Sequence, residues 1–128
     1  MKNNILGWFE IPVKDMDRAV KFYETVFGFK LQRQKMDALD MAWFPWKEGV
    51  PGAPGSLVHH EDFYIPSDQK GVLIYLTTPS GDLNGDLEKV EEAGGKTMIP
   101  RKQISEEYGY MAVIRDSEGN RIALHSRT

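Results

Sequence analysis

Hydrophobic and polar positions along this chain follow the same order twice. Within residues 8–13 apolar and polar positions alternate with the period of a β-strand, and residues 15–27 then place apolar side chains at the i, i+3, i+4 and i+7 spacing of an amphipathic helix. The same order returns as an apolar run over 71–76 and an amphipathic stretch over 82–93. Each amphipathic stretch begins at an aspartate, a good helix N-cap, and is followed by glycine. The sequence therefore predicts two copies of one unit.

A long repeat that occurs only twice does not predict a solenoid, which needs three or more stacked units. It predicts two tandem β-α-β-β-β modules, over about residues 5–63 and 70–127, within a single domain spanning 1–128. We expect an α+β fold in which a pseudo-twofold axis relates the modules and a curved mixed sheet surrounds a cleft. The strands that we expect cover 6–13, 29–36, 39–46, 55–61, 71–77, 96–104, 109–115 and 120–126.

Composition narrows the class of protein. Of the 128 residues, 41% are hydrophobic and 27% are charged, and the net charge of -3 gives no basic stripe for nucleic acid. The absence of cysteine excludes disulfides, a thiol nucleophile and a thiolate metal site. Residues 1–4 lead directly into a strand pattern with no signal peptide, and no apolar run approaches the roughly 18 residues of a membrane span. We expect a cytoplasmic protein that binds neither nucleic acid nor a membrane.

Two stretches resemble the vicinal oxygen chelate superfamily, which includes glyoxalase I, extradiol dioxygenases, bleomycin-resistance proteins and fosfomycin-resistance enzymes. Residues 10–23, from Glu-Ile-Pro-Val to Lys-Phe-Tyr, are similar to the opening strand and helix of that family, and Asp-Ser-Glu-Gly-Asn at 116–120 is similar to its closing hairpin. The pair Trp8 and Glu10 is closest to the branch related to lactoylglutathione lyase. The resemblance implies the glyoxalase/bleomycin resistance fold, a small organic molecule as partner, and a homodimer.

The resemblance also implies where a metal would bind. Metal-dependent members hold a divalent cation with His, Gln or Glu side chains from the first and last strands of each module. Carried over to this chain, three of these positions fall on Trp8, Val72 and Ala123, and the fourth falls within residues 56–60. Because such cations need oxygen or nitrogen donors, we expect the inherited metal site to be absent and no cofactor to be bound.

A relocated metal site is the alternative. Side chains two positions apart on a strand share a face, so Glu10 lies beside Trp8 and His125 lies beside Ala123. One of His59 and His60 must also point inward, because strand neighbours face opposite ways. One carboxylate and two imidazoles could hold a metal, but pocket-lining polar groups would give the same pattern.

Glu10 is the candidate catalytic residue. The alternation of the first strand places it on the face of Trp8, away from Phe9 and Ile11, which we expect to face the helices. A carboxylate on an inward face needs a partner, so Glu10 is either a general base or a structural carboxylate paired with Arg or His. Both interpretations stay open.

The other cleft residues are expected from their strand positions. Trp8 would form a cleft wall, and an indole in place of a metal ligand favours an apolar or aromatic ligand. His125 lies near the end of the chain, where a surface position is the alternative, and Tyr110 would otherwise serve strand packing. The residues that we expect to bind a ligand are Trp8, Trp43, His59, Val72, Ile74, Tyr110, Ala123 and His125.

Three functions are compatible with these residues. The first hypothesis is a metal-independent enzyme, a glyoxalase-like lyase or isomerase, that uses Glu10 as acid and base on a small carbonyl or aromatic metabolite. The second is a protein that binds a drug or metabolite without turnover, as bleomycin-resistance proteins do. The third is a metal-dependent lyase with relocated ligands. The fold alone does not separate them, because function depends on the site.

Overall fold

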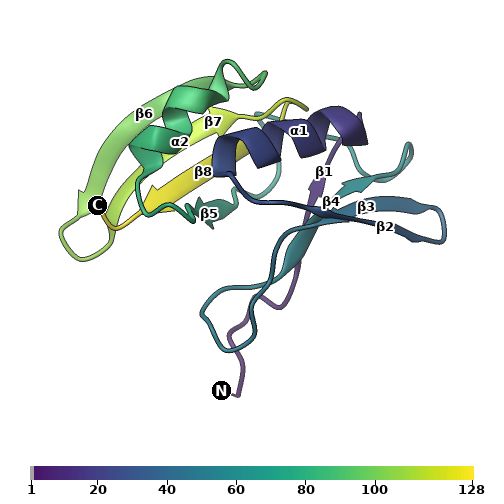
Figure 1. Ribbon diagram of the computed structural model, residues 1–128, viewed down its shortest axis with the longest axis horizontal. Coiled ribbons are helices and arrows are strands. Elements are labelled where there is room, and N and C mark those ends of the chain that lie inside the picture. Colours follow the sequence, from purple (N-terminus) through teal and green to yellow (C-terminus); the bar gives the residue numbers. More distant parts are fainter. Residues whose placement is uncertain (1) are drawn as a thin grey trace.

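Two β-α-β-β-β units follow each other in the computed structural model, which describes residues 2–128 (Figure 1). The first unit consists of β1 (Phe9–Pro12), α1 (Met16–Phe27), β2 (Gln32–Met36), β3 (Leu39–Trp43) and β4 (Gly55–His59). The second consists of β5 (Tyr75–Thr77), α2 (Leu83–Val90), β6 (Lys96–Ser105), β7 (Gly109–Arg115) and β8 (Arg121–Ser126). The predicted fold and order of elements are confirmed.

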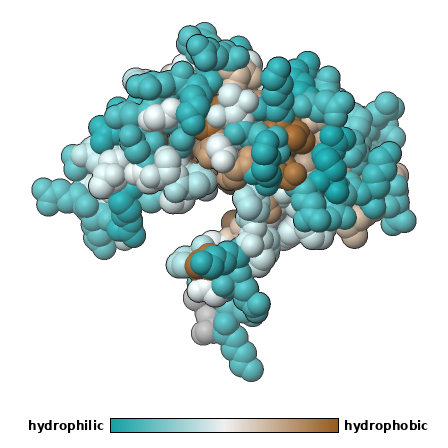
Figure 2. Space-filling view, in the orientation of Figure 1, coloured by the Kyte–Doolittle hydropathy of each residue, from teal (hydrophilic) through white to brown (hydrophobic). Residues whose placement is uncertain are grey.

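Each unit forms one four-stranded mixed sheet with the same topology. The strand orders are β1-β4-β3-β2 in the first sheet and β5-β8-β7-β6 in the second. In both, the first strand pairs in parallel with the last strand of its unit, and the other pairs are antiparallel. The N-terminal segment and the loop between β3 and β4 extend away from the body of the molecule (Figures 1 and 2).

Several predicted elements are longer than the observed ones, including a strand and the helix of the second unit. The strand expected over 71–77 begins only at Tyr75, because Gly71 has a φ of 87° and its carbonyl accepts a hydrogen bond from the Arg121 side chain rather than from a neighbouring strand. The helix expected over 82–93 ends at Val90, where the backbone N–H of Gly95 bonds to the carbonyl of Val90 and closes the turn.

One hydrophobic core joins the two units. The buried face of α1, which includes Phe22 and Tyr23, packs in the same cluster as Leu57 of the first sheet and Ile114 and Leu124 of the second. Asp15 caps the start of α1, and Gly28, with a φ of 75°, ends it. In the space-filling view, hydrophobic side chains lie mainly in the depth between the elements (Figure 2). Within residues 2–128, neither helix is long and apolar enough to cross a membrane.

Each sheet keeps one face that does not pack against the helices, which we call its open face. Leu57 and Ala42 belong to the core cluster, so the open face of the first sheet carries the residues that alternate with them, including Ser56 and Trp43. Leu124 is likewise a core residue, and the open face of the second sheet carries its neighbours on β8.

The turn between β7 and β8 fastens the second unit to α1. Asp116, at the start of this turn, accepts a hydrogen bond of 2.6 Å from the Tyr23 hydroxyl and further bonds from the backbone N–H groups of Glu118 and Asn120. Asn120 in turn donates from Nδ2 to the carbonyl oxygen of Pro12 at 2.7 Å. Burial raises the pKa of Asp116, and burial together with the neighbouring carboxylate raises the pKa of Tyr23, so that hydroxyl remains a donor.

Glu118 completes this attachment with a fully buried carboxylate. It accepts hydrogen bonds from the backbone N–H groups of Lys14 and Asp15, at 2.8 and 2.7 Å, and pairs with Arg18 at 2.7 Å. Burial alone would raise the pKa of Glu118, but the hydrogen bonds from Arg18, Asp15, Ser117 and Lys14 outweigh it and lower the pKa below its ordinary value. The carboxylate therefore stabilises the folded state in its charged form.

The substitution Glu118→Gln should lower the free energy of unfolding by about 1–3 kcal/mol at pH 7, because it removes charge-assisted hydrogen bonds from a buried site. Urea denaturation measures the effect, and Glu92→Gln, at an exposed position, is the control for the change in charge. Since the folded-state pKa of Glu118 is lowered, its contribution is complete above the ordinary glutamate pKa of about 4.3 and disappears as the pH falls through the folded value. Equal stability of wild type and Glu118→Gln at pH 7 would contradict this role.

Candidate functional site

A row of three residues crosses the open face of the first sheet. On β4, Ser56 is paired in register with Glu10 of β1 on one side and with Trp43 of β3 on the other. Residues that lie opposite each other on neighbouring strands project from the same face. The three side chains therefore form a row Trp43–Ser56–Glu10, with Ser56 fully buried at its centre.

Trp8 packs against both ends of this row. Its indole Nε1 donates a hydrogen bond of 3.2 Å to Oε2 of Glu10. Its ring also meets the ring of Trp43 edge to face, with centroids 5.4 Å apart and an interplanar angle of 74°. Trp8, Glu10 and Trp43, all expected to lie at the cleft, are thus in contact with one another.

Tyr64 supplies the second hydrogen bond to Glu10 and was not predicted. It belongs to the linker after β4, and its hydroxyl donates to Oε1 of Glu10 at 2.6 Å. This hydrogen bond, with partial burial and the charge of Glu10, raises the pKa of Tyr64, so the hydroxyl remains a donor. The only sequence signal for it is a short apolar run, Phe63 to Ile65, within an otherwise polar linker. We refer to Trp8, Glu10, Trp43, Ser56 and Tyr64 as the tryptophan–glutamate site.

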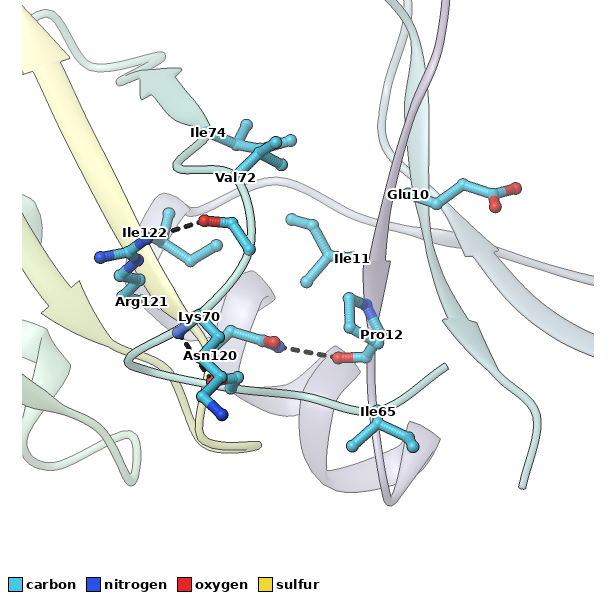
Figure 3. Close-up of a pocket in the computed structure, with 12 residues that line it drawn as sticks. Glu10, Ile11, Pro12, Ile65, Lys70, Val72, Ile74, Asn120, Arg121 and Ile122 are labelled. Atoms are coloured by element: carbon cyan, nitrogen blue, oxygen red, sulfur yellow. Dashed lines mark hydrogen bonds between the residues drawn. The ribbon is translucent and has the colours of Figure 1, made fainter. Parts of the chain in front are cut away.

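The two hydrogen bonds to the Glu10 carboxylate come from uncharged donors, the Trp8 indole and the Tyr64 hydroxyl. Within residues 2–128 no ion pair joins Glu10 to Lys, Arg or His. The pairing of Glu10 with Arg or His, which the sequence left open, is therefore not formed within the described part of the chain. Glu10 points away from the seam between the two units, on the far side of β1 from Ile11 (Figure 3). It is half-buried and therefore remains within reach of a bound molecule.

A cavity lies at that seam, and Glu10 is one of its lining residues although its carboxylate points away from it (Figure 3). It has a volume of about 200 Å³ and is bounded by β1, the segment before β5, and the start of β8 (Figure 3). Val72 and Ile74, two of the predicted ligand-binding residues, line this cavity together with Ile11 and Ile122. They do not share the open face on which the Glu10 carboxylate lies.

The remaining predicted residues lie elsewhere. His59 is on the same face of β4 as Leu57, toward the helices, and its Nδ1 is 3.0 Å from the carbonyl of Val13. Tyr110 also faces the helix side, where Arg101 covers its ring at 3.6 Å. The expectation that His59 and Tyr110 line a cleft with Glu10 is thus wrong within this chain, because strand alternation turns both to the opposite face.

Ala123 and His125 occupy the open face of the second sheet. Ala123 is fully buried there with Met111 and Val113. The two ring nitrogens of His125 lie 3.3 Å from Thr77 Oγ1 and 2.6 Å from the carbonyl of Tyr108. Both nitrogens therefore have partners in the chain, so His125 shapes this face and is not free as a ligand.

These residues do not fit a metal site of the family type. The side chains of Trp8, Val72 and Ala123 offer no donor to a divalent cation. A relocated set of Glu10, His59 or His60, and His125 is not assembled either. His59 faces the helices, His60 Nδ1 accepts a hydrogen bond from the backbone N–H of Asp62, and both nitrogens of His125 have partners. Over residues 2–128, no group of three or more His, Asp and Glu side chains is arranged to hold a metal ion.

Comparison with known proteins gives a family for the chain. A family model described as "Glyoxalase/Bleomycin resistance protein/Dioxygenase superfamily" matches residues 5–124. A curated protein from Didymella fabae, described as a "Glyoxylase-like domain-containing protein", is 27% identical over 125 residues, which is 95% of this chain and 93% of that protein.

Solved structures share the fold at lower identity. A glyoxalase I mutant from Zea mays matches with a TM-score of 0.72 and 20% identity over 95% of this chain and 46% of that one. An antibiotic binding protein from Streptomyces sp. CB03234 matches with a TM-score of 0.66 and 24% identity over 100% of this chain and 99% of that one. Proteins of similar fold thus include both a glyoxalase I and an antibiotic binding protein.

Proposed function

The chain belongs to the glyoxalase/bleomycin resistance protein/dioxygenase superfamily, and we propose that it binds a planar aromatic small molecule on the open face of its first sheet without a metal. One observation carries this proposal: two tryptophan rings and one carboxylate meet on the same face. Tryptophan faces stack on planar rings, and a carboxylate held by neutral donors accepts a further hydrogen bond from a ligand.

The chemistry of the site supports binding more than metal-assisted turnover. Its five members supply two indoles, a hydroxyl, a phenol and one carboxylate, and no imidazole. Such a set offers stacking and hydrogen bonds, which is how small-molecule sites fix orientation. The structural similarity to a protein described as antibiotic binding adds support from the same fold.

Metal-independent catalysis is the second candidate, favoured by the contact between Tyr64 and Glu10. A carboxylate with a phenol 2.6 Å away is oriented and remains available as a base. On a small carbonyl substrate, Glu10 would take a proton from the carbon next to the carbonyl and return it to a neighbouring atom. Tyr64 would act by orienting the carboxylate.

A second copy of the chain would complete the ligand site. Glu10 points away from the second unit, so the open face of the second sheet in the same chain does not lie over it (Figure 3). Large apolar side chains of the linker and the seam are exposed, namely Phe63 at 79%, Ile65 at 72% and Val72 at 83%. Exposed apolar groups of this kind mark interaction surfaces. We propose a homodimer that covers them and brings the open face of one second sheet over the partner's first sheet.

The substitution Glu10→Gln should weaken binding of naphthol-sized phenols about tenfold, because it replaces a charge-assisted hydrogen bond with a neutral one. It should change the melting temperature by less than about 2 °C, since the amide oxygen of Gln can accept from Trp8 while its N–H group donates to the Tyr64 hydroxyl oxygen. Isothermal titration calorimetry and thermal unfolding measure the two effects, with Glu92→Gln as control. A loss of several degrees with unchanged binding would make Glu10 a structural residue only.

Protein purified without an affinity tag should contain fewer than one transition-metal ion per several chains. The reason is that the inherited ligand positions hold Trp8, Val72 and Ala123. Elemental analysis by mass spectrometry gives the ratio. Stoichiometric Zn, Ni, Mn or Fe that disappears with Glu10→Gln would establish the relocated metal site instead.

Light scattering at micromolar concentration should give twice the chain mass of 14.6 kDa. The exposed linker and seam residues provide the apolar area that such an interface buries. Val72→Asp, which places a charge on the most exposed of these three side chains, should shift the mass toward that of the monomer. A monomeric wild type at this concentration would rule out the proposed dimer.

A further inference from the structure

Two hydrogen-bond donors of the tryptophan–glutamate site lack a partner in the part of the chain that the structure describes. Ser56 Oγ and Trp43 Nε1 are both buried, and neither forms a hydrogen bond within residues 2–128. Both belong to the row Trp43–Ser56–Glu10. Buried polar side-chain atoms are nearly always paired in folded proteins, so each unpaired one needs an explanation.

Trp8 contacts the side chains at both ends of the row. Its indole is bonded to Glu10 at one end of the row and touches Trp43 at the other, so the ring spans the position of Ser56 between them. Trp8 precedes β1 and has no strand partner. With 37% of its surface exposed, it can leave the row without disturbing the sheet.

Trp8 makes some of the interactions that this site offers to a ligand, but not all of them. The indole provides a flat apolar ring for Trp43 and one N–H donor for Glu10. It has no acceptor, and therefore leaves Trp43 Nε1 and the Ser56 hydroxyl unpaired. A molecule that satisfied all of these groups would need to add an acceptor to the same ring.

We propose that Trp8 occupies the place of the ligand in the free protein and that the ligand displaces it. The ligand is then a planar aromatic molecule with an O–H or N–H donor for Glu10 and, on its opposite edge, a carbonyl oxygen for Trp43 Nε1 and Ser56. This inference rests on the proposed function, because it concerns the same site. The inference adds two points to that function: the two polar groups that the ligand carries, and the displacement of the Trp8 indole by the ligand's aromatic ring.

Binding of 6-acetyl-2-naphthol tests the exchange. Trp8→Ala should bind this probe about tenfold more tightly than wild type. Without the indole, no side chain competes with the probe for the row, so the binding-competent conformation is the only one populated. Trp46→Ala, at an exposed tryptophan outside the row, should bind it like wild type. Two matched probes test the polar groups: 2-acetylnaphthalene lacks the donor, 6-ethyl-2-naphthol lacks the carbonyl, and each should bind about tenfold more weakly than the full probe.

The outcomes separate this inference from the proposed function. If wild type binds the probes and Trp8→Ala binds them more weakly, Trp8 is a fixed wall and the exchange is wrong. If both analogues bind as tightly as 6-acetyl-2-naphthol, the assigned polar groups are wrong while an aromatic ligand is retained. If neither wild type nor Trp8→Ala binds any of the three, the proposed function fails as well.

A measurement without ligand tests whether the Trp8 indole covers Ser56. Because the chain contains no cysteine, Ser56→Cys introduces a unique thiol at the centre of the row. Its alkylation by iodoacetamide should be about tenfold faster when combined with Trp8→Ala, and unchanged when combined with Trp46→Ala. Equal alkylation rates with and without Trp8 would show that the indole does not cover Ser56 and would overturn the proposal.

Discussion

The buried carboxylate of Glu118 is the contact on which the rest of the structure depends. It lies in the second unit yet binds the start of α1 in the first through Lys14, Asp15 and Arg18. Asp116 and Asn120 of the same turn bind Tyr23 and Pro12. The turn therefore fixes α1 and the end of β1 together, and an uncompensated charge would remain if either unit moved away.

This attachment determines where the candidate site can form. β1 is bonded to Asn120 at Pro12, and its other end carries Glu10 and leads back to Trp8. Because the apolar side of β1 joins the common core, Glu10 must project from the opposite face. The site therefore lies on a sheet held by the core, while Trp8 and Tyr64 approach it from segments outside the strands. A row fixed by strand pairing and flanked by side chains from outside the strands suits a site that exchanges one of these side chains for a ligand.

The alternation of apolar and polar residues predicted which side chains of β1 share a face. The residues that it did not predict enter the site through contacts between segments that are distant in the sequence. Alternation along residues 8–13 correctly separates Glu10 and Trp8 from Phe9 and Ile11. Ser56 enters the site only through the register of β4 with two other strands, which no local period encodes. The same register turns His59 toward the helices. Tyr64 comes from a linker whose path depends on the folded units, so a short apolar run is its only trace in the sequence.

The indole N–H signals of the chain test the central claim most directly. The protein contains three tryptophans, and two of them, Trp8 and Trp43, belong to the tryptophan–glutamate site. In a ¹H–¹⁵N spectrum, titration with 6-acetyl-2-naphthol should shift the indole signals of Trp8 and Trp43 together and leave that of Trp46 in place. A shift confined to Trp46, or saturable binding that moves neither site signal, would show that an aromatic ligand binds elsewhere.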